Sequence, residues 1–373
     1  MRVCIVSSSM YPVPTWRFTG YGSEIVNWWL ADYLKNKAGI DVVLFAPYSS
    51  VPPKNVEFYA IPPSYTLVNY DREYFIYEKY LDVVKRCDVI HDWSATALSA
   101  EYEFKHGKPF IVSRNGFDIT NPRFNKKNIV VLSDAARRYV QVRYSMYGIN
   151  PEVVHYGVPV DEYPFGEVKG NYVLYVGRPH PSKGIDFILE LARLNRDITF
   201  ILAWKPSGAD HHAFHEYYIN RVNELGLRNV KIHVLPGGWE GEWMKRKLMA
   251  HAKLFIQPTV YLEAFGLTAA EALATGTPLL LSTAGSGPEI IKDNSVGVLV
   301  RNKLTLTEQA ERWADMWQSA IDVDELNTVF RDAISRRWNY KAIREYAKQY
   351  FDISVMASKY MKLYERAIAG ERW

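Results

Sequence analysis

The sequence predicts an α/β protein made of two doubly wound domains. Short apolar segments alternate with longer amphipathic stretches, a pattern typical of parallel sheets with crossover helices. This pattern runs through the first half of the chain and then starts again. The length of 373 residues also suits two domains, each large enough to bury a core of its own.

In the first half, the expected strands are short apolar runs that read as buried parallel strands. They lie at residues 3–7, 41–46, 89–91, 110–113 and 129–132. The amphipathic segments 23–34, 73–86 and 134–147 lie between them and suit crossover helices, because each can cover one face of a sheet. The first half therefore predicts one doubly wound sheet.

The second half repeats this pattern. Its expected strands lie at residues 171–177, 198–203, 230–235, 253–257 and 278–282. Between the two series, residues 155–166 concentrate proline, glycine and acidic residues without periodicity, as interdomain linkers do. We therefore place the domain boundary near Gly166. After Asn302 the pattern is helical, with the last two helices expected at 340–350 and 353–369.

Composition and charge narrow the classes of partner. The chain has 48% hydrophobic and 23% charged residues, the balance of an ordinary globular protein. Its 45 basic and 41 acidic residues give a net charge of +4, too small to indicate a nucleic-acid partner but compatible with an anionic ligand. Cys4 and Cys87 are far apart and belong to no metal-binding motif, so we expect neither a disulfide scaffold nor a zinc site.

The expected location is the cytoplasm. A reducing compartment fits the two cysteines, the apolar start is too short for a signal peptide, and no apolar run approaches the roughly 18 residues that span a bilayer. The basic aromatic stretch 137–144 is a candidate for peripheral contact with an anionic membrane. The favoured alternative for this stretch is an ordinary crossover helix with a solvated face.

The segment 263–278 follows an expected strand and is the most informative candidate site. Gly266 lets the backbone approach a ligand, and Thr268 opens an expected helix whose free N–H groups favour an anion such as phosphate. Glu263 and Glu271 bracket this helix start and can accept hydrogen bonds from vicinal hydroxyls. The favoured alternative for Glu271 alone is a capping box with Thr268, which would use the carboxylate for the helix itself.

The loop at 176–184 also follows an expected strand. Arg178 and Lys183 flank a turn stiffened by Pro179 and Pro181, and these two cations can clamp a diphosphate. The alternative is a surface loop with two solvated cations, which is common in proteins.

The glycines near the first expected helix have a less specific pattern. Gly20 and Gly22 resemble part of a GxGxxG dinucleotide fingerprint, but Ile25 replaces the last glycine and the loop from Ser7 is too long. A Rossmann dehydrogenase is therefore disfavoured. Flexible backbone over a ligand cleft is a better use for these glycines.

Three further features are candidates for ligand contact. His91 ends an expected strand and can bond a substrate hydroxyl, although a structural role is favoured. The N–H groups around Ser286 and Gly287 offer another anion or hydroxyl site. Asp322 and Asp324 form an Asp-x-Asp string that can hold a divalent cation, but an acidic first helical turn is favoured.

Taken together, the order of these motifs resembles that of the retaining glycosyltransferases of family 4. Glu263 and Glu271, with seven residues between them, are similar to the family's E-x7-E signature. Residues 177–178 with 183–184 resemble its GR...KG phosphate clamp, and residues 285–289 resemble its G-G-x-x-E loop. His91 falls where the family carries its active-site histidine. The resemblance covers nearly the whole chain and is strongest at 171–300.

The resemblance implies a GT-B fold, in which two Rossmann-like domains face each other across a cleft. Residues 1–166 would form the acceptor-side domain and residues 167–351 the nucleotide-sugar domain. The C-terminal segment, about 352–373, would cross back onto the first domain. The implied activity is transfer of a hexose from a nucleotide diphosphate sugar, UDP- or GDP-linked, to an acceptor hydroxyl with the anomeric configuration kept.

The resemblance also implies roles for individual residues. Arg178 and Lys183 would neutralise the departing diphosphate, while Glu263 and Glu271 would bind the hydroxyls of the donor sugar and of the ribose. His91 would touch the sugar near the reacting carbon. The remaining donor contacts would come from Gly22, Phe265, Gly266, Leu267 and Thr268. No metal and no cofactor other than the sugar nucleotide are expected.

Two other classes of function remain open from the sequence. The first is a protein that binds a sugar nucleotide without catalysis. The second is another enzyme of the same architecture, either a sugar-nucleotide epimerase or a phosphorylase. An epimerase would convert its donor without an acceptor, and a phosphorylase would require inorganic phosphate.

Overall fold

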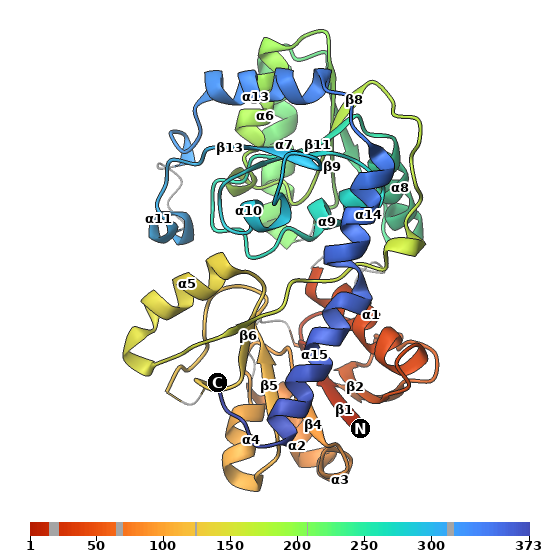
Figure 1. Cartoon of the computed structure of the whole chain (residues 1–373), viewed down its shortest axis with the longest axis vertical. Coiled ribbons are helices and arrows are strands. Elements are labelled where there is room, and N and C mark those ends of the chain that lie inside the picture. The colour runs from red at the N-terminus through yellow and green to blue at the C-terminus, as the bar shows by residue number, and fades with distance from the viewer. Residues whose placement is uncertain (15–21, 65–69, 124, 207, 312–316) are drawn as a thin grey trace. The chain divides into compact units, whose positions relative to one another are not determined.

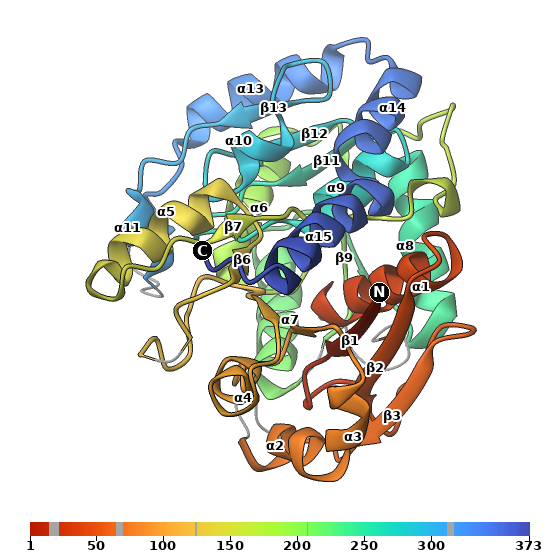
Figure 2. The same cartoon turned by 60° about the horizontal axis from the view of Figure 1, so that its bottom comes forward.

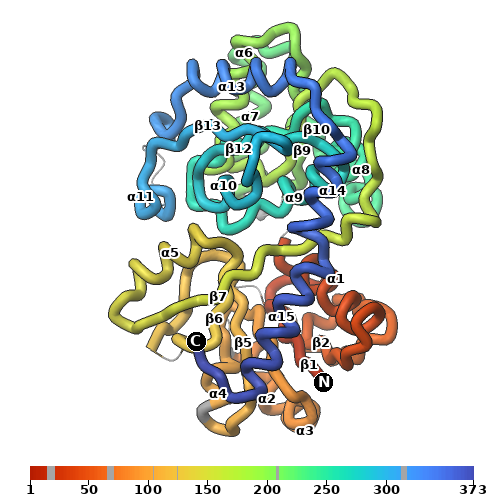
Figure 3. The backbone as a smooth tube through the Cα atoms, viewed as in Figure 1, coloured from red at the N-terminus to blue at the C-terminus, as the bar shows by residue number. Residues whose placement is uncertain are grey.

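The computed structural model contains two compact units, each built around one parallel sheet (Figure 1). It describes the whole chain except residues 15–21, 65–69, 124, 207 and 312–316. The first unit consists of Met1–Gly157 and Ile353–Trp373, and the second of Val158–Asp352. The chain therefore passes from one unit to the other twice (Figure 3).

The sheet of the first unit has the strand order β3-β2-β1-β4-β5-β6-β7, with every neighbouring pair parallel. Figure 2 shows β1, β2 and β3 side by side. The strands are β1 (Arg2–Val6), β2 (Asp41–Pro47), β3 (Glu57–Ile61), β4 (Val89–Asp92), β5 (Phe110–Ser113), β6 (Ile129–Val131) and β7 (Glu152–Val153). The sequence did not predict β3 and β7, because these edge strands are only partly buried and lack a continuous apolar run.

Helices cover the sheet of the first unit. They are α1 (Gly22–Asn36), α2 (Tyr70–Lys79), α3 (Leu81–Lys85), α4 (Ser99–His106), α5 (Asp134–Arg143) and α15 (Ile353–Ile368). The segment expected as one helix at 73–86 is broken at Tyr80, where the backbone leaves the helical conformation. The C-terminal helix α15 packs against α1, so the end of the chain completes the unit that its beginning starts.

A disulfide joins Cys4 and Cys87, and the expectation that these cysteines form no disulfide is wrong for this structure. Cys4 lies on β1, and Cys87 lies between α3 and β4. Since β1 and β4 are neighbouring strands with Val3 opposite Val89, the sheet order brings together two residues that are 83 positions apart. The cysteines therefore no longer support the expected reducing compartment.

The sheet of the second unit has the order β10-β9-β8-β11-β12-β13, again parallel throughout. Its strands are β8 (Tyr172–Val176), β9 (Thr199–Trp204), β10 (Val230–Val234), β11 (Leu254–Gln257), β12 (Leu279–Ser282) and β13 (Gly297–Val300). The helices are α6 (Ile185–Leu194), α7 (Gly208–Glu224), α8 (Gly238–His251), α9 (Leu267–Ala274), α10 (Gly287–Ile290), α11 (Leu306–Ala310), α13 (Val323–Ser335) and α14 (Tyr340–Phe351). Only β13 was not expected among these strands.

The segment 158–166 packs with the second unit, whereas the sequence placed the boundary after it, near Gly166. The N–H of Val158 donates to the carbonyl of Phe351 over 2.8 Å. A Cβ on Gly166 would lie 1.7 Å from the carbonyl oxygen of Ala250, so the chain passes too close to α8 for any side chain there. Close packing is thus built into a segment whose composition resembles that of a linker. In the part of the chain that the structure describes, no helix is long and apolar enough to cross a membrane.

Candidate donor-binding site in the second unit

The loop that carries the candidate cations and the loop that carries Glu263 follow neighbouring strands at the centre of the second sheet. The strand order reverses direction along the chain between β8 and β11, and such switch points are where open α/β sheets bind ligands beyond the carboxyl ends of their strands. Arg178 and Lys183 follow β8, and residues 263–268 follow β11. The topology thus brings the two most informative sequence motifs to one edge.

Lys183 and Glu263 form an ion pair with an Nζ to Oε2 distance of 2.5 Å. The hydroxyl of Tyr261 lies 3.0 Å from the Lys183 Nζ and donates to Glu263 Oε1 over 3.2 Å. Both side chains of the pair are largely buried, with exposed fractions of 9% and 14%. Burial favours a lower pKa for Lys183, but the charge and hydrogen bond of Glu263, together with Tyr261, outweigh it and raise that pKa above its ordinary value. The ammonium group therefore stays charged at neutral pH.

Arg178 is half-buried at the end of the same strand, and its carbonyl accepts a hydrogen bond from the hydroxyl of Tyr175 over 2.7 Å. Its positive charge acts on Lys183 and on His180. Burial, reinforced by the charges of Arg178 and Lys183, lowers the pKa of His180 to about 4. His180 is therefore neutral at physiological pH, and the fixed positive charge here comes from Arg178 and Lys183.

Helix α9 begins next to this charge cluster, but not as the sequence predicted. Its N-cap is Gly266, with a φ of 82°, and no side chain caps it. Thr268 instead donates through its hydroxyl to Gln257 over 3.4 Å. None of the described residues accepts a hydrogen bond from the N–H groups of Leu267 or Thr268, so the start of α9 keeps free donors for an anion.

Glu271 does not form the capping box that was favoured for it. The helix begins before Thr268, which places Glu271 five positions after the N-cap and out of reach of the first turn. Its side chain is buried, and Oε1 accepts hydrogen bonds from the Tyr163 hydroxyl and from Lys245 Nζ, each over 2.7 Å. Sequence analysis missed both partners, although Lys245 lies three residues after Glu242 on α8, a spacing that indicates an ion pair.

The loop at 285–289 supports the site and offers no anion site of its own, so that expectation is corrected. The N–H of Ser286 donates to the Glu263 carbonyl over 3.0 Å, and the N–H of Gly287 donates to Ala284. The Ser286 hydroxyl donates to the carbonyl of Phe265 over 2.6 Å. These donors are already used, and they hold the backbone that carries Glu263. A narrow crevice between the two loops is lined by residues that include Glu263, Phe265, Gly266, Ser282, Ser286 and Gly287.

The Asp-x-Asp string has the structural role that was favoured. Asp322 is the N-cap of α13, and its carboxylate accepts from the N–H groups of Asp324 and Glu325. Within the residues that the structure describes, no three His, Cys, Asp or Glu side chains gather in a group that could hold a metal ion.

His91 lies in the first unit and is fully buried. Its Nδ1 lies 2.7 Å from the hydroxyl of Tyr364, and its Nε2 lies 2.7 Å from that of Ser113. Burial lowers the pKa of His91 well below its ordinary value. Since the side chain has no exposed surface and both nitrogens are engaged, we replace the expected sugar contact with the structural alternative. Gly22 is half-buried at the start of α1, while Gly20 and Tyr21 lie outside the described residues.

Residues 164–337 match the family model of glycosyl transferases group 1. This matched segment makes up 174 of the 373 residues, just under half of the chain. D-inositol 3-phosphate glycosyltransferases from Mycobacterium tuberculosis and Mycobacterium bovis are 30% identical to the chain over 201 residues. The match covers 50% of this chain and 39% of each relative, so it spans well under half of the relatives' length. All the described candidate residues from Arg178 to Glu271 lie in the matched segment.

Solved structures with similar folds cover nearly the entire chain. A glycosyltransferase involved in avilamycin A biosynthesis has a TM-score of 0.71 at 19% identity, covering 100% of this chain and 99% of its own. The sucrose-phosphate synthase from Thermosynechococcus elongatus has a TM-score of 0.72 at 16% identity, covering 100% of both chains. The predicted GT-B fold, with its two doubly wound sheets, is therefore confirmed.

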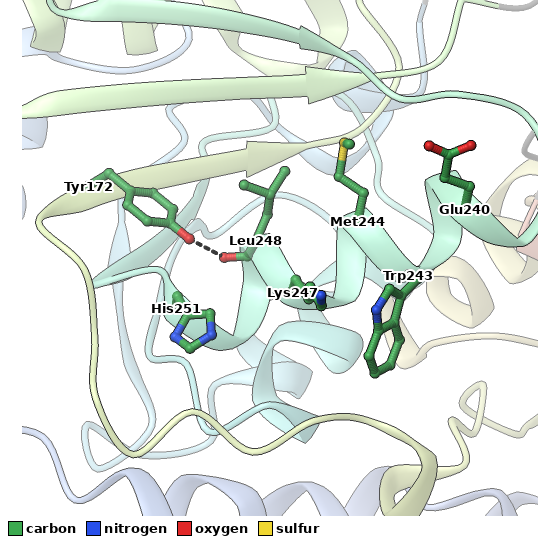
Figure 4. A pocket seen from close by; sticks show the side chains of 7 residues that line it. All are labelled: Tyr172, Glu240, Trp243, Met244, Lys247, Leu248 and His251. Carbon is green, nitrogen blue, oxygen red and sulfur yellow. Dashed lines mark hydrogen bonds between the residues drawn. The ribbon is translucent and has the colours of Figure 1, made fainter.

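A separate cavity of about 320 Å³ lies on the outer side of α8 in the matched segment (Figure 4). It is lined by Tyr172, Glu240, Trp243, Met244, Lys247, Leu248 and His251. None of the predicted site residues lines it. Helix α8 thus has an outer face that borders this cavity and an inner face that carries Lys245, the partner of Glu271.

Proposed function

We propose that the chain is a retaining glycosyltransferase that moves a hexose from a nucleotide diphosphate sugar, UDP- or GDP-linked, to an acceptor hydroxyl. The observation that carries this proposal is the buried Lys183–Glu263 pair beside the uncapped start of α9. Cations and free N–H groups suit a diphosphate, and carboxylates suit sugar and ribose hydroxyls. Both kinds of group meet at the switch point of a parallel sheet.

In the proposed reaction, the bond between the anomeric carbon and the diphosphate oxygen breaks as the acceptor oxygen bonds to the same face of that carbon. The acceptor proton passes to an oxygen of the leaving phosphate. The leaving group gains negative charge, and Arg178, Lys183 and the N–H groups of Leu267 and Thr268 stabilise it without reorganising. Glu263 orients the sugar through its hydroxyls, and Glu271 orients the ribose. The proposal includes no metal ion and no further cofactor.

Between a UDP-linked and a GDP-linked donor, we favour the UDP-linked one. The Anabaena protein HepE, solved in complex with UDP-glucose, has a TM-score of 0.67 to this chain at 16% identity, covering 100% of both chains. This likeness supports a test that begins with UDP and UDP-glucose and then includes GDP and ADP as competitors. A tight ligand raises the melting temperature by mass action, so a thermal-shift series ranks these bases directly.

Transfer assays with Arg178→Met and Lys183→Met test the site itself. We expect turnover to fall by at least about a hundredfold in each, since each removes a charge opposite the leaving group. Lys231→Met, which removes an exposed lysine on β10, is the matched control and should leave turnover unchanged. Undiminished turnover in both site variants would overturn the proposal. Donor conversion without an acceptor would instead indicate an epimerase, and NMR of the product's anomeric proton tests retention.

A further inference from the structure

We propose that Lys245 and Tyr163 are positioning residues that hold one oxygen of Glu271 and leave the other for the ribose of the donor. This inference rests on the proposed function, because it deepens the role of a residue in the same site. The two donors reach Oε1 from separate parts of the second unit. Lys245 comes from α8, while Tyr163 comes from the segment that precedes β8.

The geometry fixes the carboxylate on one side only. Oε1 receives both the Tyr163 hydroxyl and the Lys245 ammonium at 2.7 Å. Oε2 accepts no hydrogen bond from the described residues, and it is not among the fully buried side-chain atoms that lack a partner. Two donors on one oxygen restrict rotation of the carboxylate, so the second oxygen is presented in a defined direction. A preorganised acceptor of this kind loses little side-chain entropy when a ligand binds.

A third residue holds Tyr163 in place. The guanidinium of Arg246 lies 4.2 Å from the ring centroid of Tyr163 and 5.2 Å from that of Trp239. Arg246 also donates to Glu242 over 3.0 Å and to the carbonyl of Glu162 over 3.0 Å. The phenol is therefore fixed by stacking as well as by its own hydrogen bond.

The same cluster balances the charge of Glu271. Lys245 bridges Glu271 and Glu242, with Nζ to oxygen distances of 2.7 and 2.9 Å. Burial favours a lower pKa for Lys245, but the two carboxylates outweigh it and raise that pKa above its usual value. The ammonium thus stays charged. Because the Lys245 ammonium balances its charge, the Glu271 carboxylate repels an approaching diphosphate less than an unpaired carboxylate would.

The test compares binding of UDP and 2′-deoxy-UDP by calorimetry, with GDP and its 2′-deoxy analogue in their place if GDP binds more tightly. In the wild type, loss of a hydrogen bond to a charged group should weaken binding about 10- to 100-fold. In Lys245→Met and Tyr163→Phe we expect the ratio of the Kd for 2′-deoxy-UDP to the Kd for UDP to fall to about threefold or less. In transfer assays, KM for the donor should rise while kcat changes far less, because neither residue touches the reacting carbon.

Lys247→Met is the matched control, since Lys247 lies on the same helix but borders the outer cavity (Figure 4). It should keep the wild-type ratio. If Lys245→Met does not fold, Tyr163→Phe still carries the test, because it removes only a hydroxyl and keeps the ring against Arg246. Wild-type discrimination in a folded Tyr163→Phe and Lys245→Met overturns this inference. Wild-type discrimination in Glu271→Gln instead overturns the ribose assignment in the proposed function.

Discussion

Lys183 and Glu263 are 80 positions apart in the chain, yet their side chains form a largely buried ion pair. The two residues come from loops that follow the adjacent strands β8 and β11. The sequence assigned them to different parts of a ligand, one to the diphosphate and one to the sugar. Their direct contact means that a donor would bind to a preformed, charge-balanced pair.

Removing one member of this pair should destabilise the protein. Glu263→Gln leaves the Lys183 ammonium buried without its counter-charge, so we expect the free energy of unfolding to fall by about 3 kcal/mol. Denaturant titration measures this change. Lys303→Met is a suitable control, because it breaks an exposed pair with Asp322 and should change stability by less than about 1 kcal/mol. Equal effects of the two substitutions would contradict the structure.

Gly285→Ala should weaken nucleotide binding, although Gly285 need not touch the ligand. A Cβ there would lie 2.2 Å from the carbonyl oxygen of Glu263, so the backbone that carries Glu263 would have to move. We expect at least a tenfold loss of UDP affinity by calorimetry, since small displacements at a binding site are costly. Gly226 has a φ of 57°, close to the 53° of Gly285, but no atom lies within 4 Å of a Cβ built there. Gly226→Ala should therefore leave the affinity for UDP unchanged.

Glu73 should make the stability of the first unit depend on pH. Burial and the nearby Asp92 charge raise its pKa to about 7, despite hydrogen bonds from Thr96 that act in the opposite direction. The folded state therefore holds a proton that the unfolded state releases near pH 4.5, and stability should fall as pH rises from about 4.5 to 7. The limiting slope is about 1.4 kcal/mol per pH unit.

Glu73→Gln should flatten this part of the stability profile, because the amide does not titrate. Asp71→Asn, an exposed substitution on the same helix, should leave the profile as in the wild type. Denaturant titrations at intervals between pH 4.5 and 7 give the measurement. A profile of Glu73→Gln that overlays the wild type would show that this carboxyl titrates normally.

The Cys4–Cys87 bond predicts that the protein, unfolded without reductant, contains no free thiol. Thiol titration in denaturant measures this directly, and two reactive thiols per chain would contradict the bond. The double variant Cys4→Ala with Cys87→Ala should lose about 2–4 kcal/mol, as is typical when a structural disulfide is removed. A comparison of this double variant with the reduced wild type separates the contribution of the bond to the free energy of unfolding from the contribution of the packing of the two side chains.

The sequence by itself determined the architecture and the candidate places for ligand binding. Ten of the strands were predicted, and all but β10 are largely buried, because a strand buried on both faces leaves a strong local pattern. The positions of Arg178 and Glu263 after such strands then located the candidate site. The edge strands β3, β7 and β13 were missed; of these, β3 and β7 are partly exposed and leave no comparable pattern.

Only the tertiary structure decided which side chains meet. Glu271 was favoured as a capping residue from its spacing to Thr268, but Lys245 and Tyr163 engage it from distant parts of the chain. The partners of His91 and of Cys4 were likewise beyond the sequence. The physical reason is that local sequence encodes propensity and periodicity, whereas contacts across a sheet depend on strand order, and strand order is fixed only when the whole core packs.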